Sequence, residues 1–225
     1  MSTLPPEAWE ALRLSLWVAA VATLGAMPLA YGIAHALARG RFRGRRLLDA
    51  VVHLPLVLPP VVTGYALLLA FAPAGPFGGL GLAFTAWGAA LAAGVMAFPL
   101  MVRPVRLALE AVDPRLEEAA ATLGLRPGAV WRRVTLPLAA PGLVAGAVLG
   151  FAKAMGEFGA TITFAAAIPG ETLTLPSAIH GALQVPGGEG VVWALSAVAA
   201  TVAVGAVLLA DVAATRVAAR VRGRG

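Results

Sequence analysis

Long uncharged apolar runs, separated by short arginine-rich stretches, make up most of this chain. A helix that crosses a bilayer needs about 20 consecutive and mostly apolar residues. The second and third runs that qualify share one uncharged stretch, which a proline- and glycine-rich turn at residues 73–81 divides. The pattern predicts an all-α integral membrane protein, with residues 1–225 forming a single bundle of five transmembrane helices. The expected spans are residues 14–38, 54–72, 83–102, 138–159 and 191–210.

Composition supports a membrane protein and removes several classes of chemistry. Hydrophobic residues make up 60% of the chain and charged residues only 12%, whereas soluble domains carry about 25% charged residues. The chain has no cysteine, which excludes disulfides, thiolate metal sites and cysteine nucleophiles. Its histidines, His35, His53 and His180, are too far apart in the sequence to indicate a metal site.

The arginines predict the orientation in the membrane. They gather between spans one and two, between spans three and four, and after span five, and an odd number of spans places these three regions on one side. Because loops rich in Lys and Arg stay in the cytoplasm, we expect the N-terminus outside and the C-terminus inside (N-out, C-in). Membrane topology thus accounts for the net charge of +6, and no nucleic-acid partner is expected.

The longest charged and helix-forming segment, residues 113–134, lies between two very apolar runs. Asp113 can cap a helix at its start, and Gly124 can end that helix in a left-handed conformation. A turn then leads to a second short helix that starts near Pro127 and carries Trp131. On the cytoplasmic side, such a capped pair of helices predicts a docking site for another protein.

A motif in and after this segment indicates a family. Glu118-Ala119-Ala120, followed by Gly124 and by Leu136-Pro137, resembles the cytoplasmic signature of the membrane subunits of binding-protein-dependent ABC importers. In that family the segment is the coupling helix, which docks into a groove of the ATP-binding subunit. The resemblance implies a MetI-like ABC importer permease fold with a cytoplasmic coupling-helix loop. It also implies that the ATPase-coupling residues are Glu117, Glu118, Ala119, Ala120, Gly124, Leu136 and Pro137.

Two further regions narrow the resemblance. Residues 54–65, which include a proline pair and a Thr-Gly-Tyr sequence, look like the start of span two in molybdate importer permeases of the ModB type. Residues 150–164 and 168–176 are similar to the same group, although sulfate permeases share much of this region. The proline pair, the Thr-Gly-Tyr sequence and the five spans favour molybdate. Tungstate and sulfate or thiosulfate are the alternatives.

The resemblance implies a function and a set of partners. The chain would be the permease subunit of an ATP-driven importer that moves molybdate across a bacterial or archaeal plasma (inner) membrane. Its implied partners are two copies of an ATP-binding subunit, a second copy of itself, an external oxyanion-binding protein and membrane lipid. The only lysine, Lys153, follows Ala152, so a Gly-Lys-Ser/Thr phosphate-binding loop is absent. We therefore expect no enzymatic site and no cofactor in this chain, with ATP and Mg²⁺ bound by the partner subunit.

Lys153 and Glu157 are one helical turn apart inside span four and so share a helix face. Charges within a membrane are costly and usually face the bundle interior or a water-filled cavity. Two interpretations follow: a buried structural ion pair, or a face that lines the translocation pathway or gate. Thr63, near the start of span two, is a further candidate for pathway or gate lining.

Two questions remain open between alternatives. An ATP-independent secondary transporter or channel would also span the membrane, although the internal repeats typical of such transporters are not visible. Between spans four and five, residues 160–190 contain either a short external helix that starts near Pro176 or an ordered loop.

Overall fold

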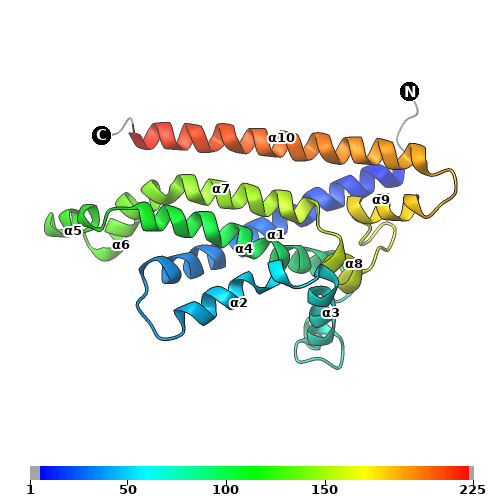
Figure 1. The fold of residues 1–225 in the computed structure, drawn as a ribbon, viewed down its shortest axis with the longest axis horizontal. Helices are drawn as coiled ribbons and strands as arrows, with labels where there is room; N and C mark the ends of the chain where they lie inside the picture. Colours follow the sequence, from blue (N-terminus) through cyan, green and yellow to red (C-terminus); the bar gives the residue numbers. More distant parts are fainter. Residues whose placement is uncertain (1–5, 223–225) are drawn as a thin grey trace.

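The computed structural model describes residues 6–222, and the regular elements in this range are all helical. Four stretches are long and apolar enough to cross a membrane: residues 8–39, 86–111, 127–155 and 189–209. A bent pair of helices supplies a fifth crossing if the pair counts as one span. The all-α membrane fold predicted from the sequence is therefore confirmed. The helices are α1 (Pro6–Arg39), α2 (Arg45–Val57), α3 (Pro60–Phe71), a 3₁₀ turn (Gly78–Leu80), α4 (Ala86–Ala111), α5 (Pro114–Thr122), α6 (Pro127–Val130), a π-helical turn (Trp131–Thr135), α7 (Leu136–Met155), α8 (Gly159–Ala165), α9 (Leu175–Leu183) and α10 (Glu189–Arg222) (Figure 1).

The second expected span, residues 54–72, is not one helix. α2 already begins at Arg45, and α3 leaves it at an angle of 111° after a break at Leu58 and Pro59. Proline lacks a backbone donor and disfavours helical geometry in the residue before it. Leu58 is accordingly extended, with ψ of 143°. The proline pair that marks this stretch in the sequence therefore breaks the span and turns α3 away from the bundle axis (Figure 1).

The fourth crossing begins earlier than the sequence indicated. The expected short cytoplasmic helix is not separate, because α6 continues through the π-helical turn into α7 and residues 127–155 form one stretch. The amide of Leu136 bonds to the carbonyl of Trp131, one residue farther back than in an α-helix. Pro137 explains this wider turn, because a proline inside a helix lacks an amide hydrogen and its ring clashes with the preceding turn.

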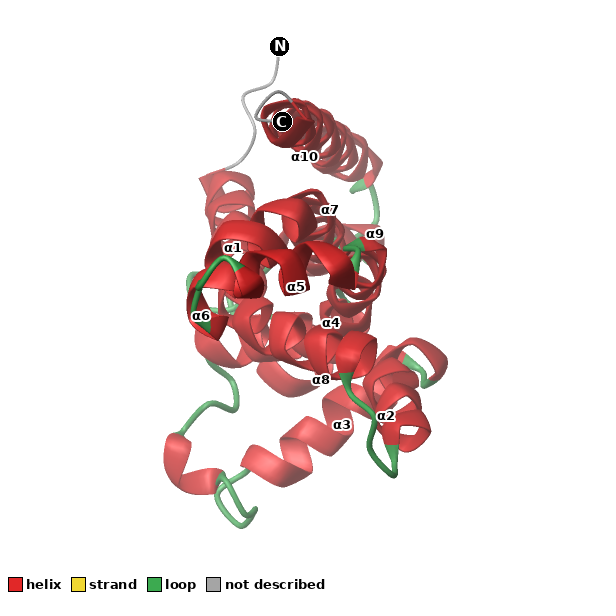
Figure 2. Cartoon of the chain, turned by 90° about the vertical axis from the view of Figure 1, so that its left-hand side faces the viewer, coloured by secondary structure: helices red, strands yellow, loops and turns green. Residues whose placement is uncertain are grey.

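The arginine-rich connections, residues 40–44 and 112–126, lie at the same end of the bundle as the C-terminal part of α10 (Figure 1). α1 and α4 run toward this end, whereas α2 and α7 run away from it. α5 and α6 cover the end, as the view along the bundle shows (Figure 2). This arrangement is the one that the positive-inside rule requires. We therefore call the end of the bundle that carries these connections the cytoplasmic end.

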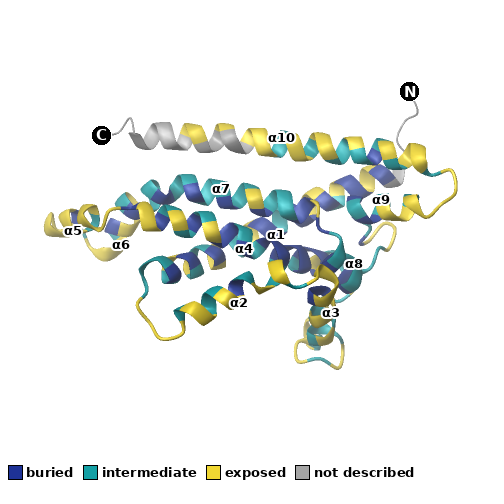
Figure 3. Cartoon of the chain, viewed as in Figure 1, coloured by how far each residue is buried: buried dark blue, intermediate teal, exposed yellow. Residues whose placement is uncertain are grey.

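The core of the bundle is built from α1, α4 and α7, and most of its buried residues are alanines. Gly142, Gly146 and Gly150 of α7 face α4, and a Cβ atom added to them would lie 2.3, 2.9 and 2.6 Å from the nearest α4 atom. Small residues let membrane helices approach each other closely. Buried residues accordingly lie along α1 and α4, whereas residues 189–209 of α10 are mostly exposed (Figure 3).

Replacing Gly142 by alanine is expected to lower the free energy of unfolding by about 2 kcal/mol, as overpacked cores do. The new methyl group would lie 2.3 Å from Ala108 Cβ and 2.7 Å from the Pro104 carbonyl oxygen, and backbone atoms cannot move aside. Gly150→Ala is the matched control, because its methyl group meets only the flexible side chain of Met101. Unfolding titrations in detergent check the difference, and equal losses for the two variants would contradict it.

Between the fourth and fifth crossings, α8 and α9 lie at the end opposite to α5 (Figure 1). α9 carries Pro176 in its first turn, which confirms the helix that the sequence offered as one alternative. The amide of Leu175 donates to Ser15 Oγ at 2.7 Å, and the Leu175 side chain packs with Leu12 and Leu195. These contacts fix α9 to α1 and α10. The sequence predicted that span four continues to residue 159. α7 instead ends at Met155, and a separate short helix, α8, follows.

Candidate functional site

α5, at the cytoplasmic end, begins and ends as the sequence predicted. The Asp113 carboxylate accepts a hydrogen bond from the amide of Arg115 at 2.9 Å. At the other end Gly124 has a φ of +84°, and the amides of Gly124 and of the next residue bond back to the carbonyls of Ala121 and Ala120. This pair of bonds is the Schellman arrangement that ends helices. Gly124 is therefore the residue that shapes the end of α5.

The outer side of α5 carries part of the predicted coupling set. Glu118 and Ala119 are exposed, whereas Ala120 is buried against the rest of the chain. Leu123, four residues after Ala119 and so on the same face, is 85% exposed, and Leu116 is 49% exposed. We call Leu116, Glu118, Ala119 and Leu123 the exposed α5 surface. The leucines were absent from the sequence-based set, although their helical spacing from Ala119 could have indicated them.

Glu117 points inward and joins three elements. Its Oε1 atom accepts a hydrogen bond from Thr135 Oγ1 at 2.7 Å and one from Arg39 Nη2 at 3.5 Å. Arg39 ends α1 and also donates to the carbonyl of Val112 at 2.9 Å. Thr135 ends the π-helical turn that leads into α7. We call Arg39, Glu117 and Thr135 the Glu117 junction, because they fix α5 to both α1 and α7.

Leu136 and Pro137 are half-buried at the start of α7 and are not part of the exposed α5 surface. Their contribution is geometric, since the π-helical turn that precedes Pro137 carries both Thr135 and Trp131. Trp131 Nε1 donates to the Tyr31 hydroxyl, and the two rings pack edge to face with centroids 6.0 Å apart. This contact is a second tie between the fourth crossing and α1.

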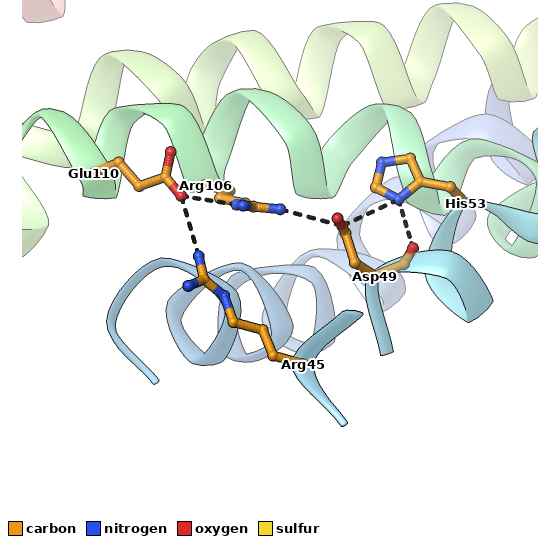
Figure 4. Close-up of polar contacts among 5 residues, drawn as sticks. All are labelled: Arg45, Asp49, His53, Arg106 and Glu110. Atoms are coloured by element: carbon orange, nitrogen blue, oxygen red, sulfur yellow. Dashed lines mark hydrogen bonds and ion pairs between the residues drawn. The ribbon is translucent and has the colours of Figure 1, made fainter. Parts of the chain in front are cut away.

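A further polar cluster at the cytoplasmic end joins α2 to α4 (Figure 4). Arg106 donates from Nε to Glu110 at 2.8 Å and from Nη1 to Asp49 at 3.1 Å. Arg45 lies 3.8 Å from the same Glu110 oxygen, and His53 Nδ1 lies 2.8 Å from the backbone carbonyl oxygen of Asp49. No local sequence pattern predicted the cluster, because Asp49 and Arg106 are 57 residues apart.

Lys153 and Glu157 form an ion pair, but not along one continuous helix. α7 ends at Met155, so Glu157 lies in the short connection to α8. The Glu157 side chain is 1% exposed and that of Lys153 29% exposed. The second Glu157 oxygen accepts a hydrogen bond from the amide of Ala160 at 3.0 Å. Glu157 therefore both pairs with Lys153 and caps the first turn of α8.

Thr63 lies on α3, where that helix packs against α8. The next residue, Gly64, comes so close that an added Cβ atom would lie 2.6 Å from the carbonyl oxygen of Ala160. Thr63 Oγ1 is buried and has no hydrogen-bond partner in the described part of the chain. Through Ala160, the structure brings Thr63, Lys153 and Glu157 to one junction of α3, α7 and α8, which we call the outer junction.

These features define a class of protein: a membrane-embedded helical bundle that holds one exposed helix rigidly at its cytoplasmic end. The family described as binding-protein-dependent transport system inner membrane component matches residues 15–223. The chain belongs to this family. It is therefore a multi-pass protein of the inner membrane. Family membership implies two classes of partner, a binding protein and a separate subunit that binds and hydrolyses ATP.

Similar proteins and structures agree with this assignment. The chain is 53% identical over 191 residues to the molybdenum transport system permease protein ModB of Escherichia coli (strain K12), a match that covers 82% of this chain and 83% of that relative. It is 50% identical over 187 residues to the protein of the same name from Haemophilus influenzae, covering 80% and 82%. A solved structure of the MetNI methionine ABC transporter aligns with a TM-score of 0.71 at 19% identity, covering 93% of this chain and 94% of that chain. The last match confirms the expected MetI-like permease fold.

Proposed function

We propose that this chain is the membrane-spanning permease subunit of an ATP-driven, binding-protein-dependent importer of molybdate. Family membership supports the transport class, and the names of two relatives at 50% identity or more support the cargo. Tungstate, which is close to molybdate in size and charge, is the nearest alternative cargo, and sulfate is the next. The permease works with an external oxyanion-binding protein that delivers the anion.

The exposed α5 surface is the proposed docking site for the ATP-binding subunit, and it is the observation that carries the proposal. Leu116, Ala119 and Leu123 offer apolar contact area, and Glu118 offers a charge beside it. Apolar side chains that gather on an exposed face favour a protein interface. Ala120 and Gly124 support this surface from below and from its end, and the remaining motif residues, Glu117, Leu136 and Pro137, position α5 from within the chain.

The Glu117 junction is the proposed transmission element. Two copies of the permease would form the pathway, with one ATP-binding subunit docked on each α5. When ATP draws the two subunits together, each α5 moves with its subunit. Because Glu117 binds both Arg39 of α1 and Thr135 beside α7, the displacement passes directly to two membrane-crossing helices. Such rigid-body motion is a common way of switching between two states.

The outer junction is the proposed pathway or gate. Three features support it: the buried Thr63 hydroxyl, which has no hydrogen-bond partner within residues 6–222, the partly exposed Lys153, and the distance of this junction from the cytoplasmic end. A free hydroxyl can donate a hydrogen bond to an oxyanion. Glu157 compensates the charge of Lys153, so Thr63 is the better candidate for direct contact with the anion.

Reconstitution of the permease with its ATP-binding subunit and binding protein in proteoliposomes tests the function. We expect molybdate and tungstate to stimulate ATP hydrolysis and sulfate to leave it unchanged. Glu118→Lys reverses a charge in the exposed α5 surface and should abolish both the stimulation and the copurification of the ATP-binding subunit. Stimulation by sulfate alone would make sulfate the cargo, and the chain would still be an ABC importer permease. Transport that persists without the ATP-binding subunit would contradict the class.

A further inference from the structure

Two cavities follow each other along α2, starting from the cytoplasmic end of the bundle. The first, of about 560 Å³, is lined mainly by charged side chains, and we call it the arginine pocket. The second, of about 590 Å³, lies between α1, α2 and α4, and we call it the apolar groove. α2 and α4 line both cavities, since Arg45 and Arg106 lie in the first and Leu48 and Phe98 in the second. The charged cavity and the apolar one therefore neighbour each other along the same two helices.

The arginine pocket has an excess of positive charge. Arg106 shares Glu110 with Arg45 and also binds Asp49, so two carboxylates serve these two arginines (Figure 4). Arg46 also lines the pocket and forms no ion pair in the described part of the chain. Among the described residues, the Arg46 guanidinium therefore has no counterion.

The start of α2 adds to this excess. No side chain caps α2 at Gly44, which also lines the pocket, so the first amides of the helix are free to face an anion. A negatively charged group of a ligand would compensate both the unpaired guanidinium of Arg46 and the end of the helix.

The apolar groove is long enough for an acyl chain, and it extends from Leu48, near the cytoplasmic end, to Trp87 at the start of α4. It follows α1 from Val21 to Ile33, which is about 18 Å of helix, and half of the hydrocarbon core of a bilayer is about 15 Å thick. Three of its lining residues, Leu29, Val51 and Trp87, are between 56% and 61% exposed, so the groove opens to its surroundings. An apolar chain that enters from the side can therefore fill it.

We propose that the arginine pocket and the apolar groove together bind one anionic phospholipid of the cytoplasmic leaflet. The phosphate group lies in the pocket near Arg46, and one acyl chain lies in the groove. Anionic lipids give the cytoplasmic leaflet its negative potential, and basic pockets between membrane helices on that side bind their headgroups. A second copy of this chain is the less suitable occupant, because it brings the same arginine-rich end and cannot supply the missing negative charge. The site is independent of the cargo and goes beyond the proposed transport function.

The first test changes the charge of the pocket. Phosphatidylglycerol is titrated onto the delipidated complex of permease and ATP-binding subunit in detergent, and native mass spectrometry measures the bound lipid. Arg46→Gln is expected to weaken binding about fivefold, the effect of one basic residue near a membrane surface. Arg43→Gln removes the same charge three residues earlier, in the connection that precedes α2 and outside the pocket, and should have a smaller effect. Equal losses for the two variants would overturn the proposal.

The second test fills the groove. Gly25 lines the apolar groove, and a side chain added there meets no atom within 4 Å of its Cβ. Gly25→Phe should therefore fold normally and weaken binding of phosphatidylglycerol about tenfold by displacing the acyl chain. Gly32→Phe is the matched control, since Gly32 has the same free space on α1 but lies outside the groove. Unchanged binding to Gly25→Phe would overturn the assignment of the groove.

Different ligands separate the remaining occupants. Phosphatidylglycerol should bind more tightly than phosphatidylcholine, and inorganic phosphate should not displace it. Displacement by phosphate at equal concentration would mean a site for a free anion and would overturn the lipid proposal. Because the chain has no cysteine, Gly25→Cys reports on contact with a second copy. A disulfide-linked dimer of that variant would make the groove a subunit interface, whereas a monomeric band with bound lipid supports the proposal. Neither result depends on whether molybdate stimulates ATP hydrolysis.

Discussion

Replacing Glu157 by alanine is expected to reduce the free energy of unfolding of the permease by about 3 kcal/mol. Glu157 is almost fully buried, and it holds both the Lys153 ammonium group and the amide of Ala160. Its loss leaves a cation and a backbone donor without partners at the place where α7 meets α8. The expected magnitude lies at the low end for broken buried pairs, since Lys153 retains 29% exposure. Unfolding titrations and the yield of folded protein measure the effect.

Two further variants separate a structural role of this pair from a role in transport. Glu157→Gln keeps an oxygen for the Ala160 amide and should lose less stability than Glu157→Ala. The double variant Lys153→Met with Glu157→Gln removes both charges together, so it should be more stable than Lys153→Met alone. If the double variant folds and transports normally, the pair is structural. If it folds but no longer transports, the pair belongs to the pathway. Unchanged stability of Glu157→Ala would refute the predicted stabilising role.

Replacing Leu123 by glutamate is expected to reduce assembly with the ATP-binding subunit roughly 100-fold, without loss of folded permease. Leu123 is 85% exposed in the chain, so a charge there disturbs no internal packing. In the proposed complex the leucine is buried, and its replacement loses apolar contact and places a carboxylate in the interface. Copurification of the ATP-binding subunit and its stimulation by the binding protein measure the effect.

The matched control for this variant is Leu183→Glu. Leu183 is 64% exposed on α9, at the opposite end of the molecule, so the same substitution there should leave copurification unchanged. Leu123→Ala should lie between the wild-type protein and Leu123→Glu, since it removes contact area without adding a charge. Full assembly of Leu123→Glu would show that the ATP-binding subunit contacts another part of the cytoplasmic end.

Local signals in the sequence predicted the local structure of the candidate site well. Asp113 caps α5, Gly124 ends it in the left-handed conformation, and Pro176 lies in the first turn of α9, because each of these features depends on a few neighbouring residues. The arginines likewise indicated which connections share one end of the bundle. Each of these signals can be read without knowing which segments lie side by side in space.

Other features depend on tertiary contacts and could not be predicted. The motif does not say which side of α5 faces the bundle, and only the contacts of Glu117 with Arg39 and Thr135 decide it. The proline pair explains why the helix breaks near residue 59, but it does not give the 111° angle between α2 and α3, because α3 is placed by its packing against α8. The pairing of Asp49 with Arg106 requires α2 and α4 to be neighbours first.

The break between α2 and α3 has a mechanical consequence. Pro59 and Pro60 have no amide hydrogen with which to continue the hydrogen bonds of α2, and the amides of Val62 and Thr63 bond to the carbonyl of Pro59 at the start of α3. Backbone hydrogen bonds therefore do not fix the angle at which α2 and α3 meet. Close contacts hold it instead, where Gly64 meets Ala160 and Gly159 meets Pro60. Adding one methyl group at either contact would therefore change the angle between α2 and α3, because no continuous hydrogen bonding between the two helices opposes the change.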